Sequence, residues 1–108
     1  MNIEELKGKS LYISGKITGD PDYKQKFANA ERILIYCGFN PVNPTVINET
    51  EWIKAMIEAL VMMLGCDVVV LLPDWGESKG VQIEKDLAEK LGMPIVKFTD
   101  LVLYGKID

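Results

Sequence analysis

An unbroken apolar run near the middle of the chain restricts the possible folds more than any other stretch. Residues 68–72, Val-Val-Val-Leu-Leu, have the composition of a strand whose two faces are both buried, as in a parallel sheet covered by helices. Pro73 ends the run, and Ser78 is a suitable N-cap for a helix. We therefore expect a buried central strand, a tight loop over residues 74–78 and a helix that begins after Ser78.

Glu84 lies on the side of this helix that we expect to face the sheet. The apolar stripe should contain Ile83, Leu87, Ala88 and Leu91, and the polar side Gln82, Lys85, Asp86, Glu89 and Lys90. Gly80 precedes Glu84 by four residues on the same face and should leave open space beside it. A carboxylate among apolar residues is costly unless it is paired or has a chemical role, although a flank residue would simply turn out to water. Because ligands of open α/β sheets bind at the carboxyl ends of strands, Glu84 is a candidate functional residue.

Strand and helix patterns alternate along the chain. Strands are expected at Ser10–Ser14, 39–42, 68–72 and 95–98. Helices are expected from Asp20-Pro21 to Tyr36, from an N-cap at Asn48 or Thr50 to Leu64, and from Ser78 to Leu91. Residues 101–104 fit either a further short strand or a helical turn. This alternation predicts a single α/β domain, residues 1–108, with a three-layer, doubly wound parallel sheet of four or five strands in a flavodoxin-like, Rossmann-like order.

The composition excludes several kinds of site. The 108 residues contain no histidine, which removes His-based acid–base catalysis, Ser-His-Asp triads and most transition-metal centres. Cys37 and Cys66 lie in apolar segments without metal-like spacing, so we expect them to be reduced and buried in a cytoplasmic protein. The net charge of −4 and the lack of a basic stripe argue against a nucleic-acid polymer as partner. The charged first residues do not form a signal peptide, and no apolar run is long enough to span a membrane.

Three predicted loops should meet at one edge of the sheet, because parallel strands place their carboxyl ends on the same side. These loops are residues 14–19, Asn43-Pro44 and residues 74–84. The Gly-Lys-Ile-Thr-Gly segment of the first lacks the spacing of a dinucleotide-binding or Walker loop. It fits either an ordinary turn or a backbone cradle in which Lys16 approaches a phosphate, and Ser78 with the amides after it would form a second anion site.

Two of these segments resemble a known enzyme family. Residues 12–19, Tyr-Ile-Ser-Gly-Lys-Ile-Thr-Gly, and residues 78–84, Ser-Lys-Gly-Val-Gln-Ile-Glu, are similar to segments of the nucleoside 2-deoxyribosyltransferase superfamily. The resemblance extends over residues 11–91. It is closest to short, mostly uncharacterised phage and bacterial members, and it includes the 2'-deoxynucleoside 5'-phosphate N-hydrolases. Its most specific part is Ser-x-Gly-x-x-x-Glu after the Cys-Asp-Val-Val-Val strand.

The resemblance implies a role for several residues. Glu84 matches the glutamate that attacks the anomeric carbon of a 2-deoxyribosyl group, and Tyr12 matches a tyrosine that orients this nucleophile. The candidate residues for binding substrate or phosphate are Ser14, Gly15, Lys16, Ile17, Gly19, Asn43, Trp75, Ser78 and Gly80. A carboxylate stabilises the oxocarbenium-like transition state of N-glycosidic cleavage without a metal or cofactor. The family is usually assembled as a homodimer or larger homo-oligomer.

One feature of the family is missing from this sequence. Active relatives carry an aspartate that acts near the leaving base, and the matching position here is Ala59, while the neighbouring Glu58 faces elsewhere on the helix. Asp67 begins the central strand and therefore lies at the wrong end of the sheet. Asp74 lies at the right end and is our substitute candidate for the acid, the alternative being a turn aspartate that binds backbone amides.

The sequence therefore supports two functions of different classes. The first is an enzyme that cleaves or exchanges the N-glycosidic bond of a 2'-deoxynucleoside or its 5'-monophosphate, by hydrolysis or by transfer. The second is a non-catalytic nucleotide- or nucleotide-sugar-binding protein, as Ala59 would favour, and a scaffold that keeps only the fold is a third possibility. A small molecule is the partner in the first two. Trp75 would stack on its base or cap the core, and Trp52 is expected in packing or in a dimer contact.

Overall fold

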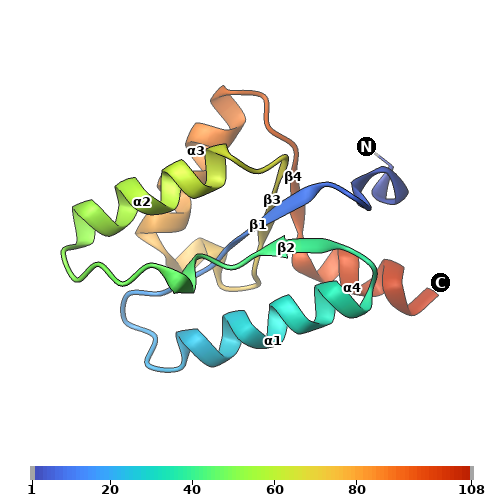
Figure 1. The fold of residues 1–108 in the computed structure, drawn as a ribbon, viewed down its shortest axis with the longest axis horizontal. Helices are drawn as coiled ribbons and strands as arrows, with labels where there is room; N and C mark the ends of the chain where they lie inside the picture. The colour runs from blue at the N-terminus through green and yellow to red at the C-terminus, as the bar shows by residue number, and fades with distance from the viewer. Residues whose placement is uncertain (1, 108) are drawn as a thin grey trace.

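The computed structural model describes the backbone of residues 2–107 and the side chains of residues 2–104. The strands in this range are β1 (Ser10–Ser14), β2 (Asn40–Val42), β3 (Val68–Leu71) and β4 (Ile95–Lys97). They form one parallel sheet in the order β2-β1-β3-β4 (Figure 1). The chain goes from β1 to β2 on one side and then crosses to β3 on the other, which confirms the doubly wound, flavodoxin-like arrangement.

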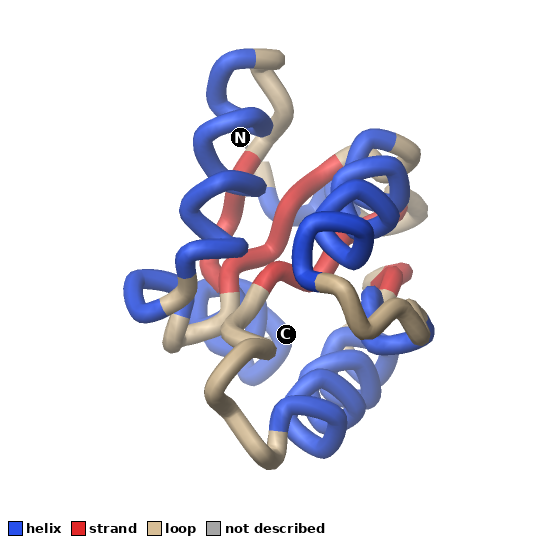
Figure 2. The backbone as a smooth tube through the Cα atoms, turned by 90° about the vertical axis from the view of Figure 1, so that its left-hand side faces the viewer, coloured by secondary structure: helices blue, strands red, loops and turns tan. Residues whose placement is uncertain are grey.

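Helices cover both faces of the sheet and complete three layers. They are α1 (Tyr23–Tyr36), α2 (Trp52–Leu64), α3 (Lys79–Lys90) and α4 (Phe98–Ile107). Short 3-10 turns occur at η1 (Ile3–Leu6), η2 (Pro44–Val46) and η3 (Trp75–Glu77). Figure 2 shows the sheet between the helical layers. None of the helices in the described part of the chain has the length and apolar character that a membrane span requires.

The alternation of side chains along β1 divides the core into two clusters. Leu11 and Ile13 pack with residues of α1 and α4, including Phe27 and Leu101. Tyr12 points to the other face and packs with the residues Met63, Val69, Leu71, Val81 and Ala88. Because successive strand residues face opposite sides, Ser14 shares the α2–α3 face with Tyr12.

The central strand and the start of the following helix agree with the predictions. Residues 68–72 are all buried, although β3 itself ends at Leu71, and the amide of Leu72 still donates to the Ser14 carbonyl at 2.8 Å. The Ser78 hydroxyl caps α3 by accepting from the Val81 amide at 3.1 Å. Glu84 is only 5% exposed and therefore lies on the inner face, as predicted.

The predicted apolar stripe of α3 is partly wrong. The buried residues of this helix are Val81, Glu84 and Ala88, whereas Ile83 is 37% and Leu91 is 58% exposed. Positions three and four apart form one helical face, and the face centred on Glu84 is the one that meets the sheet. Two apolar side chains therefore lie outside the core.

The predicted starts of the first two helices are also wrong. The α1 helix begins at Tyr23, because the Asp20 carboxylate accepts from the Asp22 amide at 2.9 Å and stabilises a turn before the helix. The N-cap of α2 is Glu51, which makes no side-chain cap hydrogen bond, and neither Asn48 nor Thr50 occupies this position. At the other end of the chain, residues 101–104 are helical and belong to α4.

Apolar side chains also cover the outer face of α2. Ile53, Ile57 and Val61 are each more than half exposed, and Leu64 is 49% exposed. Their spacing places them in one stripe along the helix, which we call the α2 stripe. The rest of the described chain leaves this stripe uncovered.

Candidate active site

A pocket with a volume of about 130 Å³ opens at the carboxyl edge of the sheet. Its wall contains Tyr12, Ile13, Gly15 and Ile17 from β1 and the next loop, Tyr23 and Phe27 from α1, Pro44, Thr45, Ile47 and Glu49 from the segment after β2, Trp52, Ala55, Met56 and Ala59 from α2, and Gly80, Val81 and Glu84 from α3. The strand order reverses beside β1, and such a switch point is where open α/β sheets bind their ligands.

Two hydroxyl groups from β1 hold the carboxylate of Glu84. The Tyr12 hydroxyl donates to Oε2 at 2.5 Å, and the Ser14 hydroxyl donates to Oε1 at 2.7 Å. Tyr12 and Ser14 are two residues apart on one strand, so their side chains project from the same face toward α3. Each carboxylate oxygen therefore has a fixed partner, and the group is oriented before any ligand arrives.

The surroundings make Glu84 a basic carboxylate. Burial raises the pKa of Glu84, and the hydrogen bonds from Tyr12 and Ser14 lower it only in part. Burial, together with the nearby Glu84 charge, raises the pKa of the Tyr12 phenol, which therefore remains a proton donor in its hydrogen bond. An oriented, poorly solvated carboxylate in an apolar pocket can stabilise or attack an electron-poor carbon.

Two glycines allow close contacts in this region. A Cβ added at Gly15 would lie 2.6 Å from Cδ1 of Leu72, so a side chain here would require the Leu72 side chain to shift. A Cβ at Gly80 would lie 3.3 Å from the sulfur of Met56, which occupies part of the space that we expected to be open beside this residue. Gly80 thus allows α2 and α3 to approach each other along the pocket wall.

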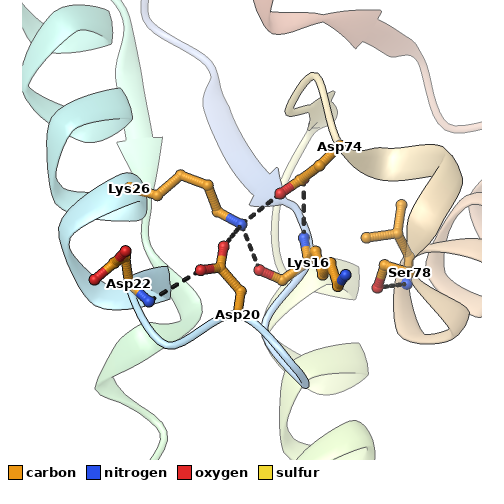
Figure 3. Close-up of polar contacts among 7 residues, drawn as sticks. Lys16, Asp20, Asp22, Lys26, Asp74 and Ser78 are labelled. Carbon is orange, nitrogen blue, oxygen red and sulfur yellow. Dashed lines mark hydrogen bonds and ion pairs between the residues drawn. The ribbon is translucent and has the colours of Figure 1, made fainter.

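Lys26 of α1 connects the first loop to the loop that follows β3. Figure 3 shows its ammonium group between two carboxylates, 2.6 Å from Oδ2 of Asp20 and 2.5 Å from Oδ2 of Asp74. It also donates to the Lys16 carbonyl at 2.6 Å, and the Lys16 amide donates to Oδ1 of Asp74 at 3.1 Å. Burial lowers the pKa of Lys26, but the two carboxylates outweigh this effect and the pKa is raised. We call the set of four residues Lys16, Asp20, Lys26 and Asp74 the Lys26 clamp.

The structure brings some of the predicted site residues to the pocket and leaves others outside it. Tyr12, Gly15, Ile17, Gly80 and Glu84 line the wall, and Ser14 contacts it through Glu84. Among the described residues, those that line the pocket do not include Lys16, Gly19, Asn43, Asp74, Trp75 or Ser78.

The predicted residues outside the wall have local partners instead. Lys16 and Asp74 belong to the Lys26 clamp, and a Cβ added at Gly19, which has a φ of +84°, would lie 3.8 Å from Cε of Lys16. Asn43 accepts from the amide of Thr45 at 2.9 Å and from its hydroxyl at 2.7 Å.

Trp75 and Ser78 have structural partners as well. Trp75 packs against the core cluster under α2 and α3, with the Lys85 ammonium 5.4 Å from its ring centroid, which supports the core-capping interpretation. Ser78 serves as the cap of α3.

The sequence interpretation did not assign several residues of the wall to the site, and Trp52 and Glu49 are two of them. Trp52, which we expected in packing or a dimer contact, lines the pocket at the start of α2, with the Lys79 ammonium 5.2 Å from its ring centroid. Glu49 lines the pocket from the loop before α2. Both follow the carboxyl end of β2, and this position is the signal that would have identified them.

The structure also places three residues that the sequence analysis weighed for the position of the leaving-group acid. Ala59 lines the pocket, while Glu58 is exposed and outside its wall. Asp67 lies at the other end of the sheet, where its carboxylate accepts from the amide and the hydroxyl of Ser10 at 3.0 and 3.1 Å. Within the described residues, no three His, Cys, Asp or Glu side chains are close enough to bind a metal ion.

Comparison with known proteins places the chain in a family. No curated protein matches the sequence. A family described as a domain of unknown function, DUF4406, matches residues 9–97. This segment includes all of β1 to β4, the helices between them and every residue of the pocket wall. The chain therefore belongs to the DUF4406 family.

Proposed function

We propose that this protein cleaves or exchanges the N-glycosidic bond of a 2'-deoxynucleoside or its 5'-monophosphate, with Glu84 as the nucleophile. The observation that carries this proposal is the buried Glu84 carboxylate, held by Tyr12 and Ser14 in an otherwise mainly apolar pocket. The resemblance to nucleoside 2-deoxyribosyltransferases supports the same assignment, because Glu84 and Tyr12 match the nucleophile and its orienting tyrosine.

The reaction requires two steps at the anomeric carbon. In the first, a Glu84 oxygen forms a bond to C1' as the C1'–N bond breaks, and the electron pair of that bond leaves with the base. In the second, water or another base attacks C1' and releases the carboxylate, with loss of a proton from the attacking group. Tyr12 and Ser14 hold the two carboxylate oxygens, so the nucleophile does not need to reorient during the reaction.

The remaining wall suits a small, partly aromatic ligand. Trp52 and Tyr23 supply ring surfaces on which a base can stack. A 5'-phosphate would bind near Lys16 and the Ser78-capped end of α3, since both offer hydrogen-bond donors to an anion close to the pocket. These features support a nucleoside or nucleotide monomer as the substrate.

A non-catalytic nucleotide-binding role is the second candidate. Ala59 favours it, because this position on the pocket wall carries no acidic group to assist the leaving base. Such a protein would bind a nucleotide or nucleotide-sugar in the same pocket without releasing the base.

Release of free base distinguishes these functions. The protein is incubated with each 2'-deoxynucleoside and each 5'-monophosphate, with and without an acceptor base, and the products are separated by chromatography. We expect base release by the wild type and by Glu58→Gln, which changes an exposed glutamate, but not by Glu84→Gln. Saturable binding in calorimetry without base release would support the binding role, and absence of both would contradict the two proposals.

We also propose that the protein forms a homo-oligomer in the cytoplasm. The α2 stripe supports the first part, because exposed apolar patches of this kind mark interaction surfaces. Cys37 and Cys66 are free and partly buried, which suits a reducing compartment.

A further inference from the structure

We propose that Glu49 is a second catalytic carboxylate, the acid that protonates the departing base. This inference rests on the proposed function of Glu84. Glu49 belongs to the loop between η2 and α2 and lines the same pocket as Glu84. In the enzyme family that the sequence resembles, an aspartate acts as the acid, and Ala59 occupies the matching position here. Cleavage of a glycosidic bond by two carboxylates requires one at the anomeric carbon and one at the leaving group.

The two carboxylates come from different elements of the pocket. Glu84 is held from α3 against β1, while Glu49 approaches from the segment before α2. Trp52 follows Glu49 by three residues and also lines the pocket, so the stacking surface and the second carboxylate are supplied by the same stretch of chain. In this arrangement the base of the substrate lies beside Glu49 and Trp52, and the anomeric carbon of its sugar lies beside Glu84.

The Glu49 side chain is positioned by a local hydrogen bond. Its Oε1 accepts from the Glu51 amide at 3.1 Å, and the carboxylate has no other hydrogen bond or ion pair within the described residues. The other oxygen, Oε2, is therefore available to the ligand. Because the amide fixes one oxygen, the second keeps a defined direction relative to the start of α2.

Other acidic groups near the pocket fit this role less well. Both carboxylate oxygens of Asp74 are engaged by the Lys26 clamp, and Asp74 is not part of the pocket wall. The Tyr12 hydroxyl is already committed to Glu84. Glu49 is the remaining carboxyl group of the wall, so it takes the role for which the sequence favoured Asp74.

The proton balance of the reaction follows directly. In the first step, Oε2 of Glu49 gives its proton to the base as the C1'–N bond breaks, while a Glu84 oxygen bonds to C1'. In the second step, the Glu49 carboxylate takes a proton from the attacking water, whose oxygen forms the new bond to C1' as Glu84 leaves. Both carboxyl groups then return to their starting protonation states.

The test compares leaving groups that need a proton with one that does not. Glu49→Gln keeps the acceptor for the Glu51 amide but cannot donate an acidic proton. We expect kcat/KM for 2'-deoxynucleosides to fall by about 10²–10⁴-fold, while cleavage of 4-nitrophenyl 2-deoxyriboside stays within a few-fold of wild type. Glu84→Gln should lose both activities, and the exposed Glu58→Gln should lose neither.

A second variant tests the role independently of the first. Glu49→Ala removes the carboxylate, and added formate should restore base release from deoxynucleosides if a missing proton carrier is the defect. Equal loss on both substrate types, no loss on either, or no rescue by formate would overturn the role of Glu49. Base release that still requires Glu84 would then leave the proposed function intact, whereas no turnover of any substrate by the wild type would overturn both.

Discussion

The Tyr12 hydroxyl donates a 2.5 Å hydrogen bond to Oε2 of Glu84, joining β1 to α3 across 72 residues of sequence. Ser14, on the same face of β1, donates to the other carboxylate oxygen. The orientation of the acid therefore depends on how the central strand packs against a helix that comes much later in the chain.

Glu84→Gln should change how the stability of the protein depends on pH. Burial raises the pKa of Glu84 in the folded protein above its ordinary value of 4.5, so folding is favoured most when the group is protonated. That contribution is present below 4.5 and is lost as the pH rises through the raised pKa. The variant does not ionise, so its free energy of unfolding relative to wild type should increase as the pH rises above 4.5 and through the raised pKa. Denaturant titrations at several pH values test this, and parallel profiles for the two proteins would contradict it.

Tyr12→Phe should shift the pH dependence of activity. In the proposed reaction Glu84 must be ionised to attack, so kcat/KM should rise with pH through its pKa. Removal of the Tyr12 hydroxyl takes away a hydrogen bond that lowers the pKa of Glu84, so the acidic limb should move to higher pH. The free energy of unfolding at neutral pH should fall by about 1.5–3 kcal/mol. Tyr36→Phe, at a residue that is 90% exposed, is the matched control and should change neither quantity.

Ala59→Asp should restore base release to the Glu49→Gln variant. Ala59 lies on the pocket wall, and an aspartate there would supply a second route for a proton to the base. We expect an increase in kcat/KM of at least about tenfold in that background. Ala28→Asp, at an exposed position of α1, provides the control. An equal response of the two variants would show that the added charge, and not its place on the wall, is responsible.

Lys26→Met should weaken the support of the pocket loops. It leaves Asp20 and Asp74 without their shared cation and removes the donor to the Lys16 carbonyl. We expect the free energy of unfolding to fall by about 1–3 kcal/mol and KM to increase more than kcat decreases. Chemical denaturation and steady-state kinetics measure these effects, with Lys24→Met on the exposed side of α1 as control. Unchanged stability would rule out a supporting role for the clamp.

Val61→Lys should dissociate the proposed homo-oligomer. The α2 stripe exposes 67% of Val61, and a lysine at its centre would introduce a charge into an apolar interface. Light scattering after size-exclusion chromatography should show a lower mass for this variant than for wild type, while Gln25→Lys on α1 should have the wild-type mass. A wild-type protein that is already monomeric at high concentration would contradict the proposed oligomer.

The sequence predicted the features that depend on local patterns. The five-residue apolar run, the Ser78 cap and the inward position of Glu84 each follow from residues close together in the chain. The alternation of strands and helices was sufficient to predict the layers and the strand order, because right-handed crossovers leave few other arrangements.

The composition of the pocket wall could not be predicted in the same way. Asp74 and Trp75 follow β3 at the correct edge, but a distant lysine engages the first and the core covers one side of the second. Glu49 and Trp52 follow the carboxyl end of β2, which places them at the correct edge of the sheet, but which side chains of this stretch enter the pocket depends on how α2 packs. The rotation of α3, which exposes Ile83, has the same origin.

The α2 wall has a consequence for divergence within the family. Trp52, Ala55, Met56 and Ala59 form one side of the pocket, while the network around Glu84 is built entirely from other elements. Under the proposed function, the side chains of α2 that contact the ligand and the nucleophile Glu84 therefore belong to separate parts of the chain. Substitutions in α2 should therefore change which ligand binds without displacing the Glu84 carboxylate. Libraries designed for new substrates should vary the α2 residues of the wall first.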